Sequence, residues 1–447
     1  MFNQEVNDMF DFAPELPAMA MIGVLLFATL PAGAAVTASD DAKASVQASR
    51  GSVRLRGFRD PEMDFQVIRS IGADAYGGGT IGEILAARDS IADGDPSAWT
   101  GAFAALAERL EADGKDRMLR GHPVSARDAF LRASSYWRAA EYYGDPRRDD
   151  AQRCGLRCRE AFLAGTRLLP GGVEDLRIPF GDTPIRGYFL RAASDDVVRP
   201  TVLMMSGYDG TSEEMFFAAG RAGLERGYNV LLFDGPGQTG MRRFFPDSAF
   251  IPDYGPVIRA VIDHAMSRTD VDPKRIALYG VSMGGYLALS GSIGEGRLAA
   301  LVLNSPITNL HEYMSAFMSR SRDSRDDMTL DELAALPDDV IPWGLRSAGM
   351  NFIRRFGATT FSGAMKALEA FDNRPRLKRL KIPTLALASR GEGAAPVRLA
   401  EEFAATSPRP VTLRIFEQSS GANMHCQLDN LPLSAAVIFD WLDETLR

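Results

Sequence analysis

The sequence predicts an α/β protein with a mostly parallel eight-stranded sheet, a helical cap before the sheet and a helical lid inserted into it. Three observations carry this prediction. From residue 171 onward, short β-rich runs alternate with helical patterns, the order typical of parallel sheets. Residues 53–170 place apolar side chains three and four positions apart without a strand pattern. Residues 307–375 interrupt the alternation with charged helical sequence before it resumes over 376–447.

The composition is that of an ordinary folded protein. Of the 447 residues, 46% are hydrophobic and 24% are charged. The formal net charge of -8 comes from 58 acidic and 50 basic residues that are spread along the chain. Because no lysine or arginine block could follow a phosphate backbone, we expect no nucleic-acid partner. We expect a small-molecule substrate, no cofactor and no metal ion, and homodimerisation is left open.

Residues 1–52 form an N-terminal extension and linker that is open to two interpretations. An apolar run over 19–30 and a small-residue site at 32–34 resemble an export signal. Four acidic residues precede the run, however, and the first basic residue is Lys43, so the basic start of such signals is missing. The run is also too short for a stable membrane span. We therefore expect a cytoplasmic protein, with export through a signal-like segment at 19–34 as the alternative.

The cap is expected to consist of helices separated by glycine-rich turns at 77–79 and 121–123. Helical patterns cover Ser97–Leu110, Ser125–Tyr143 and Ala151–Leu168. Aromatic residues in the second of these, including Tyr136, interleave with charged ones, so its face could offer a phenolic ring both stacking and polar contacts. About half of these aromatic residues are expected to pack in the core of the cap instead.

The three cysteines form neither a disulfide framework nor a zinc site, and we expect all of them to be reduced. Cys154 and Cys158 are four residues apart in a helical pattern and should be buried on one face. Cys426 directly follows His425, and its role is left open.

The sheet is expected to use eight strands. In chain order they are Val173–Pro179, Ile185–Arg191, Thr201–Met205, Val230–Phe233, Ile276–Tyr279, Ala300–Leu303, Thr384–Ala388 and Val411–Phe416. The lid, with the charged run at 319–323 and a helical pattern at 330–336, should lie between the sixth and seventh strands.

The strongest chemical motif is a G-x-S-x-G sequence around Ser282. It directly follows the strand at 276–279 and precedes a helical pattern at 286–290. A serine at such a strand–turn–helix junction projects its hydroxyl above the sheet, where it can act as a nucleophile. Ser282 is therefore the candidate nucleophile.

A serine nucleophile needs a base with a pKa near neutrality, and histidine is the usual one. The chain has four histidines, and His425 alone lies in the loop after the last strand. His264 precedes the nucleophile and is expected to pack or be solvated. For His122 in the cap and His311 in the lid, both a place at the pocket and a solvated or capping role stay open.

The third residue of a catalytic triad with serine and histidine should be a carboxylate that orients the histidine. Glu392 immediately follows the seventh strand, and the chain order Ser282, Glu392, His425 is the one known for this motif. The alternative is Glu312, the first acid after the sixth strand, which is also a candidate pocket residue.

An oxyanion that develops on the substrate needs hydrogen-bond donors that are already in position before the reaction. One should be the backbone amide of Met283, which follows the nucleophile. The other should come from the loop after the third strand, where Tyr208 is the best candidate and Gly207 is expected to line the pocket. Asp209 in the same loop is expected to cap the helix that begins near Thr211.

Taken together, these motifs resemble the FrsA-like esterase subgroup of the α/β-hydrolases, whose members have an N-terminal helical cap. The resemblance runs from Phe58 to the C-terminus, and its signposts are at 76–83, 121–134, 234–237, 280–285 and 421–427. It implies the α/β-hydrolase fold. The subgroup includes a bacterial 2,6-dihydroxypseudooxynicotine hydrolase and fungal polyketide-shortening hydrolases, so the resemblance also implies cleavage of a carbon–carbon bond beside an aryl ketone. This sequence differs from the subgroup in the loop after the seventh strand. Similar sequences often carry a second acid there, whereas this one has Arg390.

The sequence therefore predicts a serine hydrolase with a Ser-His-Glu triad that cleaves an ester or a ketone-adjacent carbon–carbon bond. The expected substrate is bulky and aromatic or polyketide-like. Two alternatives stay open: an acyl-peptide hydrolase or peptidase, and a non-hydrolytic cyclase or binding protein on the same fold.

Overall fold

The computed structural model describes residues 57–144, 149–317, 327–337, 339–341 and 343–447. The signal-like segment at 19–34, the linker that follows it and the charged run at 319–323 lie outside these residues. Within the described ranges, no helix is both long and apolar enough to cross a membrane.

One mostly parallel sheet of eight strands forms the centre of the molecule, in the order β1-β2-β4-β3-β5-β6-β7-β8. β2 pairs antiparallel with β1 and β4, and the remaining neighbours are parallel. Each predicted strand is present, which confirms the predicted fold class, and β5 extends beyond its predicted bounds at both ends. The strands are β1 Val173–Ile178, β2 Ile185–Leu190, β3 Arg199–Met205, β4 Asn229–Asp234, β5 Val271–Val281, β6 Ala300–Asn304, β7 Thr384–Ser389 and β8 Val411–Phe416.

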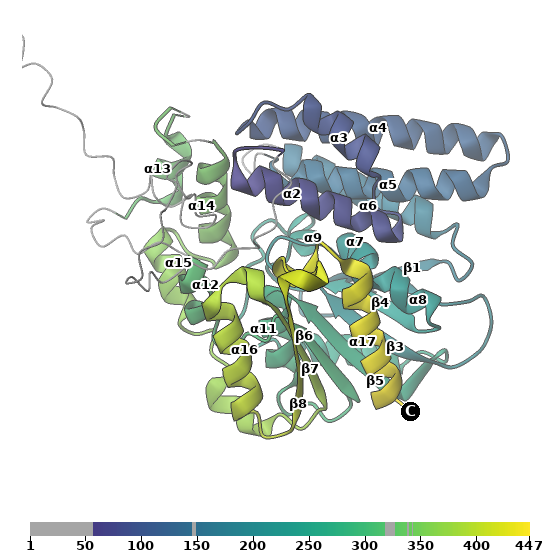
Figure 1. Ribbon diagram of the computed structural model, residues 1–447, viewed down its shortest axis with the longest axis vertical. Coiled ribbons are helices and arrows are strands. Elements are labelled where there is room, and N and C mark those ends of the chain that lie inside the picture. The colour runs from purple at the N-terminus through teal and green to yellow at the C-terminus, as the bar shows by residue number, and fades with distance from the viewer. Residues whose placement is uncertain (1–56, 145–148, 318–326, 338, 342) are drawn as a thin grey trace, which may run out of the picture.

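Both faces of the sheet are covered by helices (Figure 1). Alternate residues of β3 show this, because Leu203 belongs to the apolar cluster on one face and the adjacent Val202 to the cluster on the other. α10, α11 and α16 contribute to the first cluster, and α8 and α17 to the second. The core helices are α7 Ser212–Met215, α8 Arg221–Glu225, α9 Thr239–Arg242, α10 Gly255–Met266, α11 Met283–Ser292, α16 Ala394–Thr406 and α17 Leu431–Thr445.

Helices α2–α6, here called the cap, lie over one edge of the sheet with α4, α5 and α6 side by side (Figure 1). They are α2 Pro61–Gly72, α3 Ile81–Asp89, α4 Pro96–Leu119, α5 Pro123–Tyr142 and α6 Asp150–Thr166. α2 and α4 begin where an aspartate, Asp60 or Asp95, accepts backbone N–H bonds and a proline follows. The cap has its own apolar cluster, and Cys154 and Cys158 are buried in it as free thiols, as predicted.

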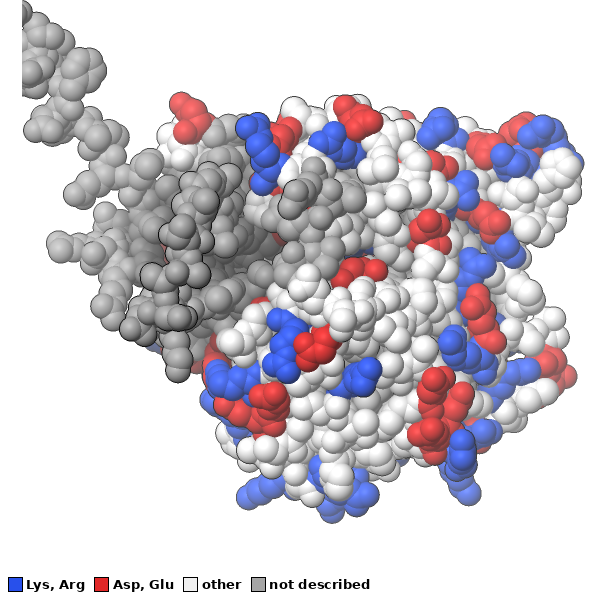
Figure 2. All heavy atoms as spheres, viewed as in Figure 1, with Lys and Arg blue, Asp and Glu red and all other residues white. Residues whose placement is uncertain are grey.

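Among the described residues, four α-helices between β6 and β7 are here called the lid. They are α12 Leu310–Phe317, α13 Leu330–Ala335, α14 Trp343–Arg355 and α15 Phe361–Leu368. A small apolar cluster that includes Leu333, Met350 and Ile353 joins α13 to α14. On the face of the molecule shown in Figure 2, acidic and basic side chains are intermixed, in keeping with the dispersed charge of the sequence.

A buried ion pair joins the cap to the core. Arg243, directly after α9, donates from Nε and Nη2 to the carboxylate of Glu141 on α5, at 2.7 and 2.5 Å. Its Nη1 donates to Oε1 of Glu213 on α7 at 2.9 Å, and this oxygen also accepts from the Tyr188 hydroxyl at 2.5 Å. All three charged side chains are at most 8% exposed, so water screens this interaction little.

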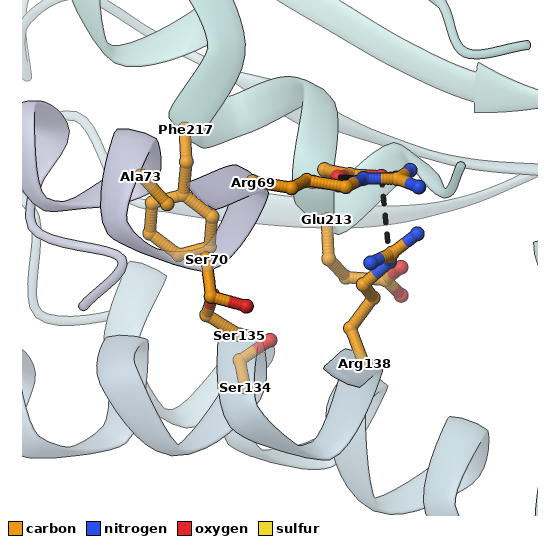
Figure 3. A pocket seen from close by; sticks show the side chains of 9 residues that line it. Arg69, Ser70, Ala73, Ser134, Ser135, Arg138, Glu213 and Phe217 are labelled. Atoms are coloured by element: carbon orange, nitrogen blue, oxygen red, sulfur yellow. Dashed lines mark hydrogen bonds and ion pairs between the residues drawn. The ribbon is translucent and has the colours of Figure 1, made fainter. Parts of the chain in front are cut away.

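A second cluster of charges lies beside the first. Arg69 of α2 donates to Glu214 of α7 from Nε and Nη2, at 2.5 and 2.6 Å, and to Asp209 at 3.3 Å. Arg138 of α5 lies 3.4 Å from the same Glu214 carboxylate. Figure 3 shows the side chains of Arg69 and Arg138 converging beside Glu213, so two cap helices meet one short core helix here.

Arg243→Met should lower the free energy of unfolding by about 3–5 kcal/mol, because it leaves two buried carboxylates without their cation. Urea denaturation would measure the loss. The matched control is Arg120→Gln, which removes an arginine whose pair with Asp116 is 58% exposed on both sides, and it should cost at most about 1 kcal/mol. Equal losses in the two variants would show that the buried pair does not hold the cap to the core.

Candidate active site

Ser282 occupies a sharp turn between the end of β5 and the start of α11. Its backbone has φ 57° and ψ −128°, a conformation that residues other than glycine rarely adopt. Neighbouring segments leave no room for side chains around it. A Cβ at Gly284 would lie 2.4 Å from the Ser206 carbonyl oxygen. A Cβ at Gly207 would lie 2.8 Å from the Cβ atom of Ser282. The motif therefore needs glycine at position 284 so that the loop after β3 can approach the serine.

Three side chains predicted from the sequence form one hydrogen-bonded row. His425 Nε2 lies 2.8 Å from Ser282 Oγ, and His425 Nδ1 lies 2.5 Å from Glu392 Oε1. They follow three parallel strands, since Ser282 comes after β5, Glu392 after β7 and His425 after β8. Parallel strands end at the same edge of a sheet, which brings residues far apart in the chain to one point.

Glu392 is completely buried and has further donors besides the histidine. Its Oε1 accepts from the Tyr313 hydroxyl at 3.2 Å, and its Oε2 accepts from the Ser389 N–H at 3.4 Å. Burial by itself disfavours the imidazolium, but the interactions of the ring with Cys426 and Glu392 outweigh it and raise the pKa of His425 above its ordinary value. The arrangement can therefore hold a proton on His425 that comes from Ser282.

The loop that carries His425 is tied to the nucleophile through Asn304 at the end of β6. The Asn304 backbone oxygen accepts from the Ser282 N–H and, at 3.3 Å, from the Cys426 thiol. Its side-chain amide donates to Gln427 Oε1 at 2.9 Å, and Gln427 Nε2 donates to Ser389 Oγ at 2.9 Å. Asn304 and Gln427 were not predicted as site residues, because no motif marks a buried amide.

The loop after β3 is held from two sides next to Ser282. Gln238 Nε2 donates to the Ser206 carbonyl oxygen at 2.7 Å, and Arg355 Nη1 of α14 donates to the Tyr208 carbonyl oxygen at 2.8 Å. Met283, the other predicted donor residue, opens α11, where the first amides have no acceptor within the helix. Gly207 thus lies against the serine and Met283 follows it in the chain, while Tyr208 is the next residue of the same loop.

The structure does not bring three other candidates to this site. Tyr136 is fully buried in the cap core, where its hydroxyl donates to Glu83 at 2.8 Å and accepts from the Thr80 N–H. His122 lies exposed in the turn between α4 and α5 of the cap. The side chain of Glu312 is 37% exposed on α12, where it pairs with two arginines. The expectation that these residues line the pocket is therefore not met.

Asp209 also differs from the expectation. α7 is capped by Thr211, whose hydroxyl accepts from the Glu214 N–H at 3.2 Å, whereas Asp209 pairs with Arg69 of the cap. The sequence places both residues within reach of the helix start, and only the docked cap decides between them.

Comparisons with known proteins show the family of the chain. Residues 202–429 match the Alpha/beta hydrolase family. Hydrolase LUC6 of Fusarium sp is 27% identical over 420 residues, which cover 87% of this chain and 97% of LUC6. Hydrolase ORFZ of Pyricularia oryzae is 31% identical over 354 residues, which cover 73% of this chain and 82% of ORFZ.

Among solved structures, 2,6-dihydroxy-pseudo-oxynicotine hydrolase has a similar fold. Its TM-score is 0.65 at 22% sequence identity, with 84% of this chain and 95% of that chain covered. The eight-stranded sheet, the serine turn and the match over 202–429 together show that this chain is a hydrolase and belongs to the α/β-hydrolase family.

Proposed function

We propose that this hydrolase uses Ser282 as nucleophile, His425 as general base and Glu392 as the acid that orients the histidine. The observation that carries the proposal is the continuous row from Ser282 Oγ through the imidazole to the buried carboxylate, with separations of 2.8 and 2.5 Å. Such a row lets a weak hydroxyl nucleophile lose its proton as it attacks.

The proposed reaction begins when Ser282 Oγ attacks a carbonyl carbon of the substrate and His425 Nε2 takes the hydroxyl proton. The backbone amides of Met283 and Tyr208 would stabilise the oxyanion of the tetrahedral intermediate. On collapse, His425 returns the proton to the leaving group, either an alcohol oxygen or the carbon of an enolate stabilised by a neighbouring ketone. Water then hydrolyses the acyl-enzyme by the same steps and releases a carboxylic acid.

A bulky aromatic or polyketide-like substrate is the second part of the proposal. Aromatic rings lie beside the loop that carries Tyr208, whose ring is stacked with Phe250 and Phe356 at centroid distances of 6.0 and 6.4 Å. Phe356 directly follows α14 of the lid, so core and lid both contribute to this group. The sequence resemblance to hydrolases of carbon–carbon bonds beside aryl ketones points the same way.

Ser282→Ala should reduce turnover by at least about 10³-fold, because removal of a nucleophile leaves only binding and oxyanion stabilisation. Assays with p-nitrophenyl esters and aryl 1,3-diketones would measure it, and circular dichroism should show an unchanged fold. In the wild-type protein, a serine-directed phosphonate should add its mass to Ser282. A variant that keeps more than a few per cent of activity would exclude Ser282 as the nucleophile.

Glu392→Gln should lower kcat by about 10²–10⁴-fold, since the imidazolium loses the carboxylate that stabilises it. The pH profile of kcat/KM should change as well. The base must be neutral, so activity falls as pH drops through the pKa of His425. Because Glu392 helps to raise that pKa, the acid limb should move to lower pH in the variant. Glu312→Gln is the matched control, and a severe loss there with a silent Glu392→Gln would place the acid after β6.

Aryl ketones or aryl esters should react with higher kcat/KM than short aliphatic esters. The reason is that the half-buried ring of Tyr208, which is backed by the buried rings of Phe250 and Phe356, offers apolar surface that a small acyl group cannot cover. A side-by-side comparison of aryl 1,3-diketones with p-nitrophenyl acetate would measure the preference. A clear preference for the acetate, or for peptides, would contradict this substrate class.

A further inference from the structure

A cavity of about 230 Å³ lies where the cap, the core and the lid meet, and arginines dominate its lining. Five of them line it, namely Arg138 from α5, Arg242 and Arg243 from the end of α9 and the position after it, and Arg354 and Arg355 from the end of α14. Its acidic lining residues are Glu141, Asp149 and Asp209. The cavity is therefore positively charged, and its walls come from all three parts of the molecule.

The acids already have cations of their own or lie in water. Glu141 pairs with Arg243, and Asp209 pairs with Arg69. Asp149 is exposed. Arg138 is likewise satisfied, because it lies beside the Glu214 carboxylate. Arg354 lies 3.9 Å from the Asp247 carboxylate. These pairs leave the charges of Arg242 and Arg355 to be explained.

Arg242 and Arg355 form no ion pair with any carboxylate of the described residues. Arg242 Nη1 donates to the Ser248 carbonyl oxygen at 2.6 Å. Arg355 donates to the carbonyl oxygens of Tyr208 and Gly237 and to the Thr239 hydroxyl, at 2.8, 2.9 and 3.1 Å. Both guanidinium groups thus donate hydrogen bonds to neutral oxygens. The Cζ of Arg355 also lies 4.9 Å from the centroid of the Tyr208 ring. Neither cation is paired with a carboxylate within the described part of the chain.

Burial makes this arrangement costly without a further partner. Arg355 is only 8% exposed, and its Nε has no hydrogen-bond acceptor among the described residues. A buried N–H without an acceptor costs free energy that a bound oxygen would recover. Burial, followed by the charges of Arg355 and Arg354, lowers the pKa of Arg242 to about 10. An anion in the cavity would relieve both effects.

We propose that this cavity is an anion subsite that binds a carboxylate of the substrate through Arg242 and Arg355. The planar guanidinium fork matches the two oxygens of a carboxylate. Arg355 also donates to the Tyr208 carbonyl oxygen, and Tyr208 adjoins the glycine that lies against Ser282. The subsite is therefore joined to the loop beside Ser282, although Ser282 itself does not line the cavity. Resting on the proposed function, it narrows the substrate to aryl compounds that carry a carboxylate away from the bond that breaks.

The test measures binding without catalysis, by calorimetry on the Ser282→Ala protein. The probes are phenylacetate and 3-phenylpropionate, each compared with its neutral amide. We expect the carboxylates to bind about 10- to 100-fold more tightly than the amides, since hydrogen bonds to charged groups are the strong ones. Adding Arg242→Gln should remove this preference. Arg242→Lys keeps the charge without the fork and should retain part of it.

Arg120→Gln is the matched control, because it removes one positive charge from an exposed position on the cap and should leave the preference unchanged. Equal binding of carboxylates and amides to the Ser282→Ala protein would overturn the subsite. A preference that survives Arg242→Gln in a folded protein would overturn it too. Neither result would affect the proposed function, which fails instead if Ser282→Ala still hydrolyses esters or diketones.

Discussion

The arrangement of this hydrolase depends on one buried cation, Arg243, held between the carboxylates of Glu141 in the cap and Glu213 in the core. An ion pair so far from water gains little net stability over an apolar contact, because all three groups lose their hydration. What it does is to exclude other arrangements, since any shift of the cap would leave a buried charge alone. Because Glu213 lies on the short helix α7, the ion pair also fixes the position of the loop before this helix, which borders Ser282.

The core on one side, and the cap and lid on the other, supply different parts of the proposed site. The strand ends supply the serine, histidine and glutamate, and Asn304 locks the nucleophile turn to the histidine loop through short-range hydrogen bonds. Cap and lid supply the charged cavity and part of the aromatic surface. Chemistry in the proposed mechanism therefore rests on the rigid sheet, whereas selection of the substrate rests on the helices placed over it.

The fold and the row of three side chains could be predicted from the sequence because their signals are local. A glycine-flanked serine directly after a strand, and a glutamate and a histidine after two later strands, need only the topology of the sheet to meet. Tyr136, His122 and Asp209 could not be placed in this way. The surroundings of Tyr136 and His122 depend on how the cap helices pack against one another. Those of Asp209 depend on how the cap docks, since Arg69 and Asp209 are 140 positions apart. Arg355 gave no signal either, because its partners are backbone oxygens in distant segments.

The two side chains that hold the loop after β3 have different origins, Gln238 from the core and Arg355 from the inserted lid. One of the proposed oxyanion donors is thus set partly by a segment that looks like an accessory to the fold. Lids are attractive units to exchange when the selectivity of such enzymes is redesigned. In this protein a transplanted lid would have to bring an arginine to the same carbonyl oxygen, or the graft would change the catalytic power of the core together with its choice of substrate.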